Sequence, residues 1–250
     1  DLLGSEPVTV VLSDRGWVRA AKGHDVDPLT LSYRTGDGFR FAARGRNNQT
    51  AVFLDSTGRA YSLQAHTLPS ARGQGEPLSG RINPPDGASF EGVIMVESGA
   101  RYLLGTDAGF GFVVVADELV AKNRAGKVIL TVPTNAKVLP PVEVTNAADA
   151  EVVVVTNTGR LLIHQLGELP ELSKGKGVKT INISSERARS GEELVVSMLV
   201  LESEQRLAIY AGRRHLTLRN SDLDGYRLGR GRRGRALPRG FQRVDRMAIE

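Results

Sequence analysis

The sequence predicts an all-β chain with the architecture of a five-bladed β-propeller. Three observations predict it: a hairpin pattern that occurs five times, a nearly constant spacing between the copies, and few segments that could form helices. The turn glycines of successive copies are 42, 51, 50 and 53 residues apart. A repeat of about fifty residues that contains short strands is typical of one propeller blade of about four strands.

Each copy of the pattern is an apolar strand, a polar turn that ends in glycine, and a second strand. The first four turns offer Asp, Asn or Ser, whose side chains bond the nearby backbone, and then a Gly that can take a positive φ angle. This is the chemistry of a β-hairpin. The predicted strand pairs are 10–12 with 17–18, 51–54 with 59–61, 102–105 with 110–112, 152–155 with 160–162 and, in a weaker copy, 207–210 with 213–214.

Further strands fit between the hairpins, and their predicted ranges are 39–43, 93–96, 128–132 and 194–200. One short helix is expected at residues 184–189, because Pro and Gly interrupt most other windows. No low-complexity linker divides the chain, so we expect residues 1–250 to form a single domain. A β-sandwich with irregular loops is the alternative, and the regular period disfavours it.

The composition excludes several classes of protein. The chain has no cysteine, which excludes disulfides, thiolate catalysis and cysteine-ligated metal sites. No stretch approaches the roughly 20 apolar residues of a membrane span, and the first residues lack the features of a signal peptide. We therefore expect a soluble, cytoplasmic protein without a membrane partner. Because the chain begins with Asp1 rather than Met, we expect a fragment of a longer polypeptide.

Positive charge is concentrated near the C-terminus. Residues 206–246 contain twelve Arg and three Asp, a net charge of +9, whereas residues 1–205 have a net charge of −3. The planar guanidinium of Arg matches phosphate geometry better than the ammonium of Lys does. The segment therefore indicates phosphate binding, and a solvated basic tail is the alternative.

Segments rich in glycine and cations also recur, at residues 19–24, 72–75, 122–127, 174–179 and 230–235. In the middle three, the first cation follows the turn glycine by 14, 13 and 15 residues. A cluster at a fixed place in each blade would lie along one rim. Glycine lets backbone amides approach a phosphate closely, and an adjacent Lys or Arg neutralises its charge. The alternative is that these glycines only form turns between blades.

Repeated around a rim, these segments would form a curved basic track for DNA. Bending about 20–30 base pairs along it would cost about 1–6 kcal/mol, which phosphate contacts must offset. No recognition helix is predicted, so binding should be largely independent of sequence and steeply dependent on salt. The residues predicted to bind DNA are Arg19, Lys22, Arg44, Arg46, Arg72, Lys122, Arg124, Lys127, Lys174, Lys176, Lys179, Arg230, Arg232, Arg233 and Arg235.

Other signals are interpreted as structural. Residues 229–234 spell G-x-G-x-x-G, but they lack the strand-turn-helix setting and the later acidic residue of a dinucleotide site. The four histidines are scattered, so no metal site is expected. Asp14, Asp55 and Asp107 recur as in a propeller glycosidase, but they lie in hairpin turns, where capping explains them. We predict no catalytic residue, metal or cofactor in this chain.

Together, the motifs resemble the C-terminal domain of the ParC polypeptide of bacterial topoisomerase IV, in the family shared with gyrase A. The resemblance runs nearly end to end, and it rests on the order and spacing of motifs that are weak individually. The motifs are SDRGWVRAAKGH at 13–24, DSTGR at 55–59, LPSARGQGEPL at 68–78, DAGFGF at 107–112, KNRAGK at 122–127, LSKGKG at 172–177 and GRGRRG at 229–234. The glutamine-led basic box of gyrase A has no intact copy here, which favours topoisomerase IV over the gyrase A alternative.

The resemblance implies a broken five-bladed propeller, the β-pinwheel, in which neighbouring blades exchange strands and DNA binds the outer rim. It implies a parent type IIA topoisomerase that decatenates chromosomes and relaxes supercoils, with its catalytic tyrosine outside this chain and with ATP and Mg²⁺ used in other domains. The implied partners are double-stranded DNA, the rest of ParC, and the second polypeptide of topoisomerase IV in an A2B2 assembly associated with the nucleoid. The resemblance also allows contact with bacterial condensin, and the isolated domain is expected to be a monomer. A protein-interaction propeller that binds no DNA is the competing hypothesis.

Overall fold

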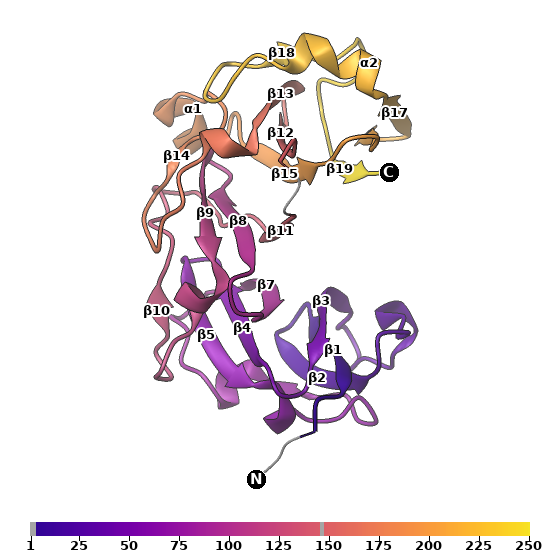
Figure 1. Ribbon diagram of the computed structural model, residues 1–250, viewed down its shortest axis with the longest axis vertical. Coiled ribbons are helices and arrows are strands. Elements are labelled where there is room, and N and C mark those ends of the chain that lie inside the picture. The colour runs from indigo at the N-terminus through magenta and orange to yellow at the C-terminus, as the bar shows by residue number, and fades with distance from the viewer. Residues whose placement is uncertain (1–3, 146–147) are drawn as a thin grey trace. The chain divides into compact units, whose positions relative to one another are not determined.

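The computed structural model describes residues 4–145 and 148–250, so the expectation that rests on Asp1 lies outside the described residues. The described chain forms five antiparallel sheets and little helix, which confirms the predicted all-β class and its five repeated modules (Figure 1). The chain divides into two compact units, and each is described by itself. The first unit comprises Asp1–Ala100 and Val115–Ile129, and the second unit comprises Arg101–Val114 and Leu130–Glu250.

The first unit contains two four-stranded sheets. The first sheet has the order β3-β1-β2-β6, and its strands are β1 Pro7–Ser13, β2 Trp17–Lys22, β3 Phe39–Arg46 and β6 Glu76–Pro77. The second sheet has the order β10-β5-β4-β7, and its strands are β4 Thr50–Asp55, β5 Arg59–Gln64, β7 Phe90–Met95 and β10 Lys127–Val128. Strands were therefore predicted correctly around residues 39–43 and 93–96.

The second unit contains three sheets. The third sheet has the order β11-β8-β9-β14, and its strands are β8 Arg101–Thr106, β9 Phe110–Val115, β11 Val142–Val144 and β14 Val178–Lys179. The fourth has the order β15-β12-β13-β18, and its strands are β12 Glu151–Thr156, β13 Arg160–Gln165, β15 Val195–Leu201 and β18 Arg235–Ala236. The fifth has the order β17-β16-β19, and its strands are β16 Leu207–Ala211, β17 Arg214–Leu218 and β19 Arg246–Ile249.

The first four sheets share a plan in which one strand is donated from further along the chain. A hairpin forms the centre of the sheet, and a longer strand that follows it pairs on one side. On the other side lies a strand of two residues that the chain supplies only after the next hairpin. For example, β6 follows β4 and β5 in sequence but pairs with β2, where Trp17 lies opposite Pro77. This arrangement confirms the exchange of strands between neighbouring modules.

A glycine directly precedes each exchanged strand. These glycines are Gly75, Gly126, Gly177 and Gly234, with φ angles of 90°, 68°, 84° and 80°. In each case a Cβ atom would come closer than 3.0 Å to a carbonyl oxygen of the receiving strand, a distance that real Cβ atoms essentially never show. Only glycine therefore fits, because it alone combines the positive φ with the close approach of two backbones.

The hairpin turns follow the predicted chemistry. In the first four hairpins the N–H of the turn glycine donates to the carbonyl oxygen three residues earlier. Asp55 also caps its turn, because its Oδ1 accepts hydrogen bonds from the N–H groups of Thr57 and Arg59 at 2.9 and 3.1 Å. Its Oδ2 accepts a hydrogen bond of 2.7 Å from the hydroxyl of Tyr61. This carboxylate thus serves the fold, as its place in the turn predicted.

Helical structure is short throughout the described chain. The helices are α1 Ser185–Ser190 and α2 Asn220–Leu223, and the 3-10 turns are Pro28–Thr30, Ala65–Thr67, Leu78–Gly80, Ala116–Leu119, Leu166–Glu168 and Asp224–Tyr226. The helix predicted at 184–189 is confirmed, and the side chain of Ser184 caps its N-terminus. None of the helices in the described residues is long and apolar enough to cross a membrane.

The strand predicted at residues 128–132 is wrong beyond its first residue. Strand β10 ends at Val128. Beyond it, Leu130 forms only an isolated bridge with Gly175, and the N–H groups of Ile129 and Thr131 donate to the carbonyls of Gly58 and Gly175. Ile129 and Leu130 are each 1% exposed. The stretch is apolar because it is buried, and a short apolar run does not by itself distinguish a strand from other buried backbone.

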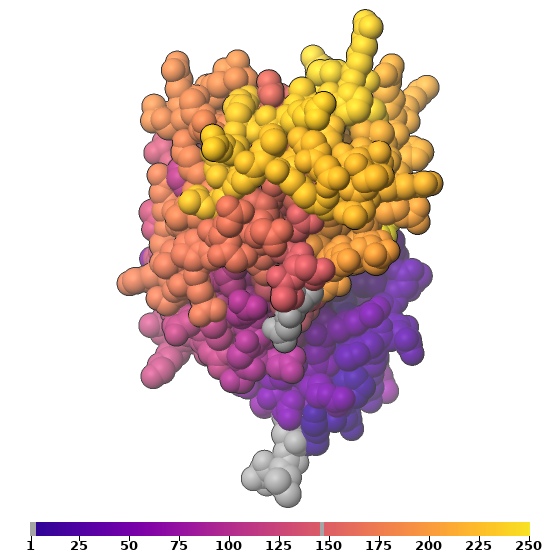
Figure 2. All heavy atoms as spheres, turned by 45° about the horizontal axis from the view of Figure 1, so that its top comes forward, coloured from indigo at the N-terminus to yellow at the C-terminus, as the bar shows by residue number. Residues whose placement is uncertain are grey.

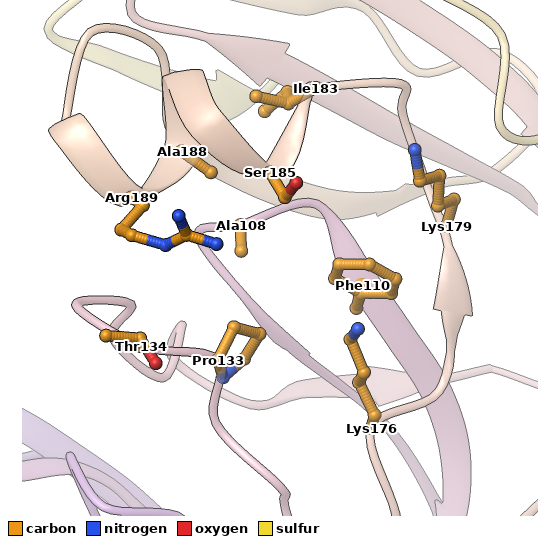
Figure 3. A pocket seen from close by; sticks show the side chains of 10 residues that line it. All are labelled: Ala108, Phe110, Pro133, Thr134, Lys176, Lys179, Ile183, Ser185, Ala188 and Arg189. Atoms are coloured by element: carbon orange, nitrogen blue, oxygen red, sulfur yellow. The ribbon is translucent and has the colours of Figure 1, made fainter.

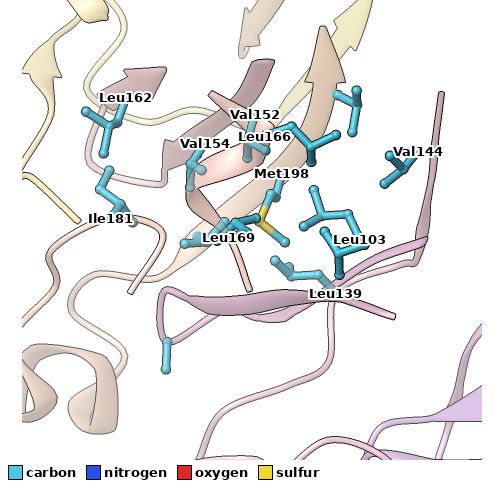
Figure 4. Close-up of a cluster of buried hydrophobic side chains, with 14 of the residues drawn as sticks. Leu103, Leu139, Val144, Val152, Val154, Leu162, Leu166, Leu169, Ile181 and Met198 are labelled. Atoms are coloured by element: carbon cyan, nitrogen blue, oxygen red, sulfur yellow. The ribbon is translucent and has the colours of Figure 1, made fainter. Parts of the chain in front are cut away.

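Buried apolar side chains form three clusters, each within one unit. The first unit has a cluster around Phe53 and Tyr61, and the second unit has one around Leu103 and Met198 (Figure 4) and another around Ile209. Strand β12 contributes to both clusters of the second unit, because alternate residues of a strand point to opposite faces of its sheet. This burial on two faces explains the unbroken valine run from residue 152 to residue 155.

Candidate nucleic-acid interface

Four of the predicted cation-rich segments lead directly into the exchanged strands. Residues 72–75 precede β6, residues 122–127 run into β10, residues 174–179 run into β14, and residues 230–235 run into β18. Each segment therefore takes the same place in the topology of the sheet that receives it. The recurring cations and glycines in the sequence therefore belong to one repeated structural element, the loop that leads into each exchanged strand.

In the first unit, most of the predicted cations are exposed. Arg44 and Arg46 alternate with inward residues along β3, Lys22 ends β2, and Arg72 and Lys122 lie in loops. Of these five, only Arg46 donates a side-chain hydrogen bond within the described residues, to the carbonyl of Ser5 at 3.1 Å. The guanidinium or ammonium groups of this set are accessible to a phosphate.

Two further cations of the first unit lie at the start of β10 or just before it. Arg124 is exposed, and its guanidinium makes long hydrogen bonds of 3.3 and 3.4 Å to the carbonyl of Gly80 and to Oδ1 of Asn83. Lys127, the first residue of β10, is partly buried. Both groups keep donors that a phosphate could use.

Arg19 differs from the rest of the predicted set because it is buried, with 2% of its surface exposed. Its guanidinium donates to the carbonyl of Gly73 at 2.8 Å and lies 4.7 Å from the centre of the Tyr33 ring. A phosphate cannot reach it. The prediction that Arg19 contacts DNA directly is therefore corrected: Arg19 holds the loop that carries Arg72.

In the second unit, the lysines of residues 174–179 are exposed and lack carboxylate partners within the described range. The ammonium of Lys176 lies 4.1 Å from the centre of the Phe110 ring, and that of Lys179 lies 3.0 Å from Oδ1 of Asn182. No side-chain partner of Lys174 is found among the described residues. These contacts are weak, so the lysine charges stay available to a ligand.

The arginines of residues 230–235 are bonded within the protein to a greater extent. Arg230 donates to the carbonyl of Lys179 at 2.9 Å, and Arg235 lies 5.9 Å from the centre of the Tyr226 ring. Arg233 forms an ion pair of 2.7 Å with Glu193. Arg232 is exposed and free of such contacts in the described structure. Figure 2 shows the C-terminal residues, in yellow, beside orange residues at the surface of the second unit.

Glu193 is the buried centre of this bonding, with no exposed surface. Its Oε2 accepts hydrogen bonds from the hydroxyls of Thr156 and Thr158 at 3.0 and 2.5 Å, and from Arg233 at 3.0 Å. Burial alone would raise the pKa of Glu193, but hydrogen bonds from the two threonines and Arg233, together with the charge of Arg233, lower it. The carboxylate is therefore ionised at neutral pH and holds residues 230–235 against the fourth sheet. Sequence reasoning missed this role, because nothing in the sequence marks one glutamate among many as buried.

The other candidate chemistry does not assemble into a site. No group of three His, Cys, Asp or Glu residues that could hold a metal ion occurs in the described part of the chain. His164 is 3% exposed, and burial holds the pKa of its imidazole below the ordinary value. Asp107 accepts a hydrogen bond of 2.8 Å from the N–H of Lys137, and burial raises the pKa of its carboxyl group. His164 and Asp107 belong to different hairpins, those of the fourth and third sheets, and form no common site.

Sequence comparisons relate the chain to known proteins. A family model described as the DNA gyrase C-terminal domain, beta-propeller, matches residues 101–140 and 150–202. The A polypeptide of DNA topoisomerase 4 from Pseudomonas aeruginosa is 53% identical over 250 residues, which are 100% of this chain and 33% of that protein. Its counterpart from Escherichia coli K12 is 48% identical over 250 residues, again 100% of this chain and 33% of that protein. The chain thus spans about a third of the length of these curated relatives.

Comparisons with solved structures give the same relationship as the sequence comparisons. The structure of the E. coli ParC C-terminal domain matches with a TM-score of 0.89 and 48% identity, covering 98% of this chain and 99% of that one. The structure of a DNA gyrase A C-terminal domain matches with a TM-score of 0.67, 16% identity, and coverage of 96% and 81%. At that identity the second match supports the fold alone. Together with the family model, these matches confirm the predicted β-propeller class.

Proposed function

Because the chain belongs to the family of ParC C-terminal domains of DNA topoisomerase IV, we propose that it binds double-stranded DNA and bends it without catalysing a reaction itself. In this proposal the domain engages the duplex through its cations and helps the parent enzyme select the DNA geometry for decatenation and supercoil relaxation. The catalytic tyrosine, ATP and Mg²⁺ belong to other parts of that enzyme. The proposed setting is a nucleoid-associated A2B2 assembly with the second polypeptide of topoisomerase IV, and bacterial condensin is a further partner.

The main support for the proposal is that nearly all of the predicted DNA-binding cations lack a carboxylate partner within the protein. Of the fifteen predicted DNA-binding residues, only Arg233 forms an ion pair in the described structure. The arginines that pair with carboxylates elsewhere, which were not among those predicted, are Arg40, Arg81, Arg187 and Arg227. A protein that leaves a repeated set of surface cations without carboxylate partners keeps net positive charge there that can bind anions.

The form of the recognition follows from the same structure. The described helices span six and four residues, too short to place a recognition helix in a groove. The available donors are Lys and Arg side chains, which suit phosphates. Phosphate contacts release counterions and carry no direct sequence information, so binding should depend strongly on salt and little on sequence.

The decisive experiment measures the affinity of the chain for two unrelated linear duplexes of equal length as salt is varied. We expect affinity to fall by about 10³-fold or more between about 50 and 200 mM salt if six or more phosphates are neutralised. Dyes at the two ends of the duplex should move closer together in the complex, because the DNA bends. Affinity that is unchanged by salt would contradict the proposal of phosphate binding.

Two matched double variants sharpen this test. Lys174→Gln with Lys176→Gln should weaken binding to both duplexes and reduce the salt slope by about two, because two available charges are lost. Arg230→Gln with Arg233→Gln removes the same charge from groups bonded inside the protein, and its direct effect on binding should be smaller. A lysine effect confined to one of the duplexes would indicate base reading instead.

A further inference from the structure

A cavity of about 360 Å³ lies in the second unit, beside the cation-rich residues that run into β14 (Figure 3). Its lining comes from the hairpin of the third sheet, from residues 133–134, from residues 176–183 and from α1. Pockets of this size hold small molecules or parts of larger ones. The DNA-binding prediction from the sequence included Lys176 and Lys179 but not the third cation of the lining, Arg189.

The lining carries three positive charges and no acidic residue. Arg189 extends from α1 toward Ala108 (Figure 3), and its guanidinium has no hydrogen-bond or ion-pair partner among the described residues. Lys176 rests against the Phe110 ring, and Lys179 bonds only the neutral side chain of Asn182. Three cations around one hollow without a carboxylate favour an anionic occupant, and the guanidinium fork can bind phosphate through two hydrogen bonds.

The rest of the lining is apolar, with two hydroxyl groups. Ile183 and Ala188 are buried, at 2% and 7% exposure, and the ring of Phe110 forms part of the wall. The hydroxyls of Ser185 and Thr134 complete the lining. An inorganic anion would use the cations and leave the apolar wall empty, so the ligand should carry an apolar or flat body next to its charge.

We propose that this cavity, the Arg189 pocket, binds a nucleotide. Arg189 and the two lysines hold its phosphate, the hydroxyls bond its sugar, and the Phe110 side of the wall packs against its sugar or base. The contact of Lys176 with Phe110 is a weak one, of about 0.5–1 kcal/mol at an exposed site, so this ammonium can turn to the phosphate. The nucleotide has two possible sources, a unit of bound DNA or a free nucleoside phosphate, and only the first rests on the proposed DNA-binding function.

The test uses the 250-residue chain, with adenosine 5′-monophosphate, adenosine and inorganic phosphate as probes in ligand-observed NMR. We expect the monophosphate to bind with a dissociation constant of about 1 mM or tighter, and each of the other probes to bind at least about tenfold more weakly. Arg189→Gln should weaken monophosphate binding by about tenfold or more, since it removes a charge-assisted hydrogen bond. Lys174→Gln is the matched control, because this exposed lysine lies two residues before Lys176 in the same cation-rich segment but does not line the pocket.

Three outcomes would overturn the proposal: no binding of the monophosphate, equal binding of adenosine, or equal losses in Arg189→Gln and Lys174→Gln. Because the Arg189 side chain has no internal partner in the described structure, both variants should unfold at the same temperature as the wild type.

A second measurement identifies the source of the nucleotide. If DNA supplies it, Arg189→Gln lowers duplex affinity more than Lys174→Gln does, and the monophosphate competes with the duplex. If both variants lose duplex affinity equally while the monophosphate result holds, the source is a free nucleotide. The wild-type chain could bind DNA in a salt-dependent way and yet not bind adenosine 5′-monophosphate. That result would contradict the proposed nucleotide pocket but would agree with the proposed DNA-binding function.

Discussion

Residues 174–179 and residues 230–235 occupy the same place in the third and fourth sheets, yet they use their charges differently. Both run into an exchanged strand through an obligatory glycine, and they carry three lysines and four arginines respectively. The lysines make no ion pairs in the described structure, whereas two of the arginines are bonded inside the protein: Arg230 donates to a backbone carbonyl and Arg233 pairs with a buried carboxylate. Formal charge in a sequence therefore overstates the charge that a ligand can use.

The difference follows from the chemistry of the two side chains. A guanidinium has five N–H donors that point outward in one rigid plane. One edge of the group can therefore donate hydrogen bonds to acceptors inside the protein. The buried Glu193 requires such a partner, because an unpaired buried carboxylate is costly. The lysine segment packs beside no buried acid in the described residues, and its flexible ammonium groups stay solvated.

The largest effect that would sharpen this comparison is expected at the glycines of the two segments. Gly177→Ala should destabilise the fold by about 3 kcal/mol, because φ is 84° and the new methyl group would meet the carbonyl of Gly111. Gly231→Ala is the control, since φ is 74° but the nearest atom would be 3.5 Å away. It should cost about 1 kcal/mol. Urea unfolding of both variants measures the difference, and equal losses would show that close approach does not matter.

A smaller effect is expected from the buried carboxylate. Glu193→Ala should cost about 2 kcal/mol of stability, since it leaves Arg233, the buried Thr156 hydroxyl and the partly buried Thr158 hydroxyl without this acceptor. Glu192→Ala, which removes an exposed carboxylate 3.6 Å from Arg187, should cost about 0.5 kcal/mol or less. Thermal unfolding compares the two. If Glu193→Ala proved as mild as its neighbour, the arginine segment would not be held as described.

The smallest expected effect is that the stabilisation contributed by the Glu193 carboxylate depends on pH. Because the folded-state pKa of Glu193 is lowered, its ionised form stabilises the fold above the ordinary value of 4.5, and this contribution is lost as pH falls through the folded value. The difference in unfolding free energy between the wild type and Glu193→Gln should therefore be constant near neutral pH and shrink in acid below that value. A difference that grows on acidification would contradict this linkage.

Much of the fold was predictable because its repeated parts use local chemistry. Turn glycines and the glycines before the exchanged strands are required by backbone geometry, so they recur in the sequence and reveal the modules. The stretch 128–132 was misread because burial and strand pairing produce the same apolar run. Arg19 was misassigned because nothing local shows that its guanidinium faces Gly73 and Tyr33 rather than solvent.

The remaining features depend on contacts between residues far apart in sequence. The pair of Glu193 with Arg233 joins residues 40 positions apart, and each residue looks ordinary alone. The Arg189 pocket likewise needs the hairpin of the third sheet, α1 and residues 133–134 to meet. The predicted helix placed Arg189 in the right element, but only the three-dimensional structure shows that its side chain lines a hollow.

The donated strands also bear on how such a chain is synthesised and on how it can evolve. The second strand of the first hairpin ends at Lys22, but its outer partner ends at Pro77, which leaves the ribosome roughly 3–10 s later at ordinary rates of translation. During that interval the nascent sheet keeps an open edge. Deleting one module from the middle of the gene would likewise remove the strand that its predecessor receives, so each module depends on the segment that follows it.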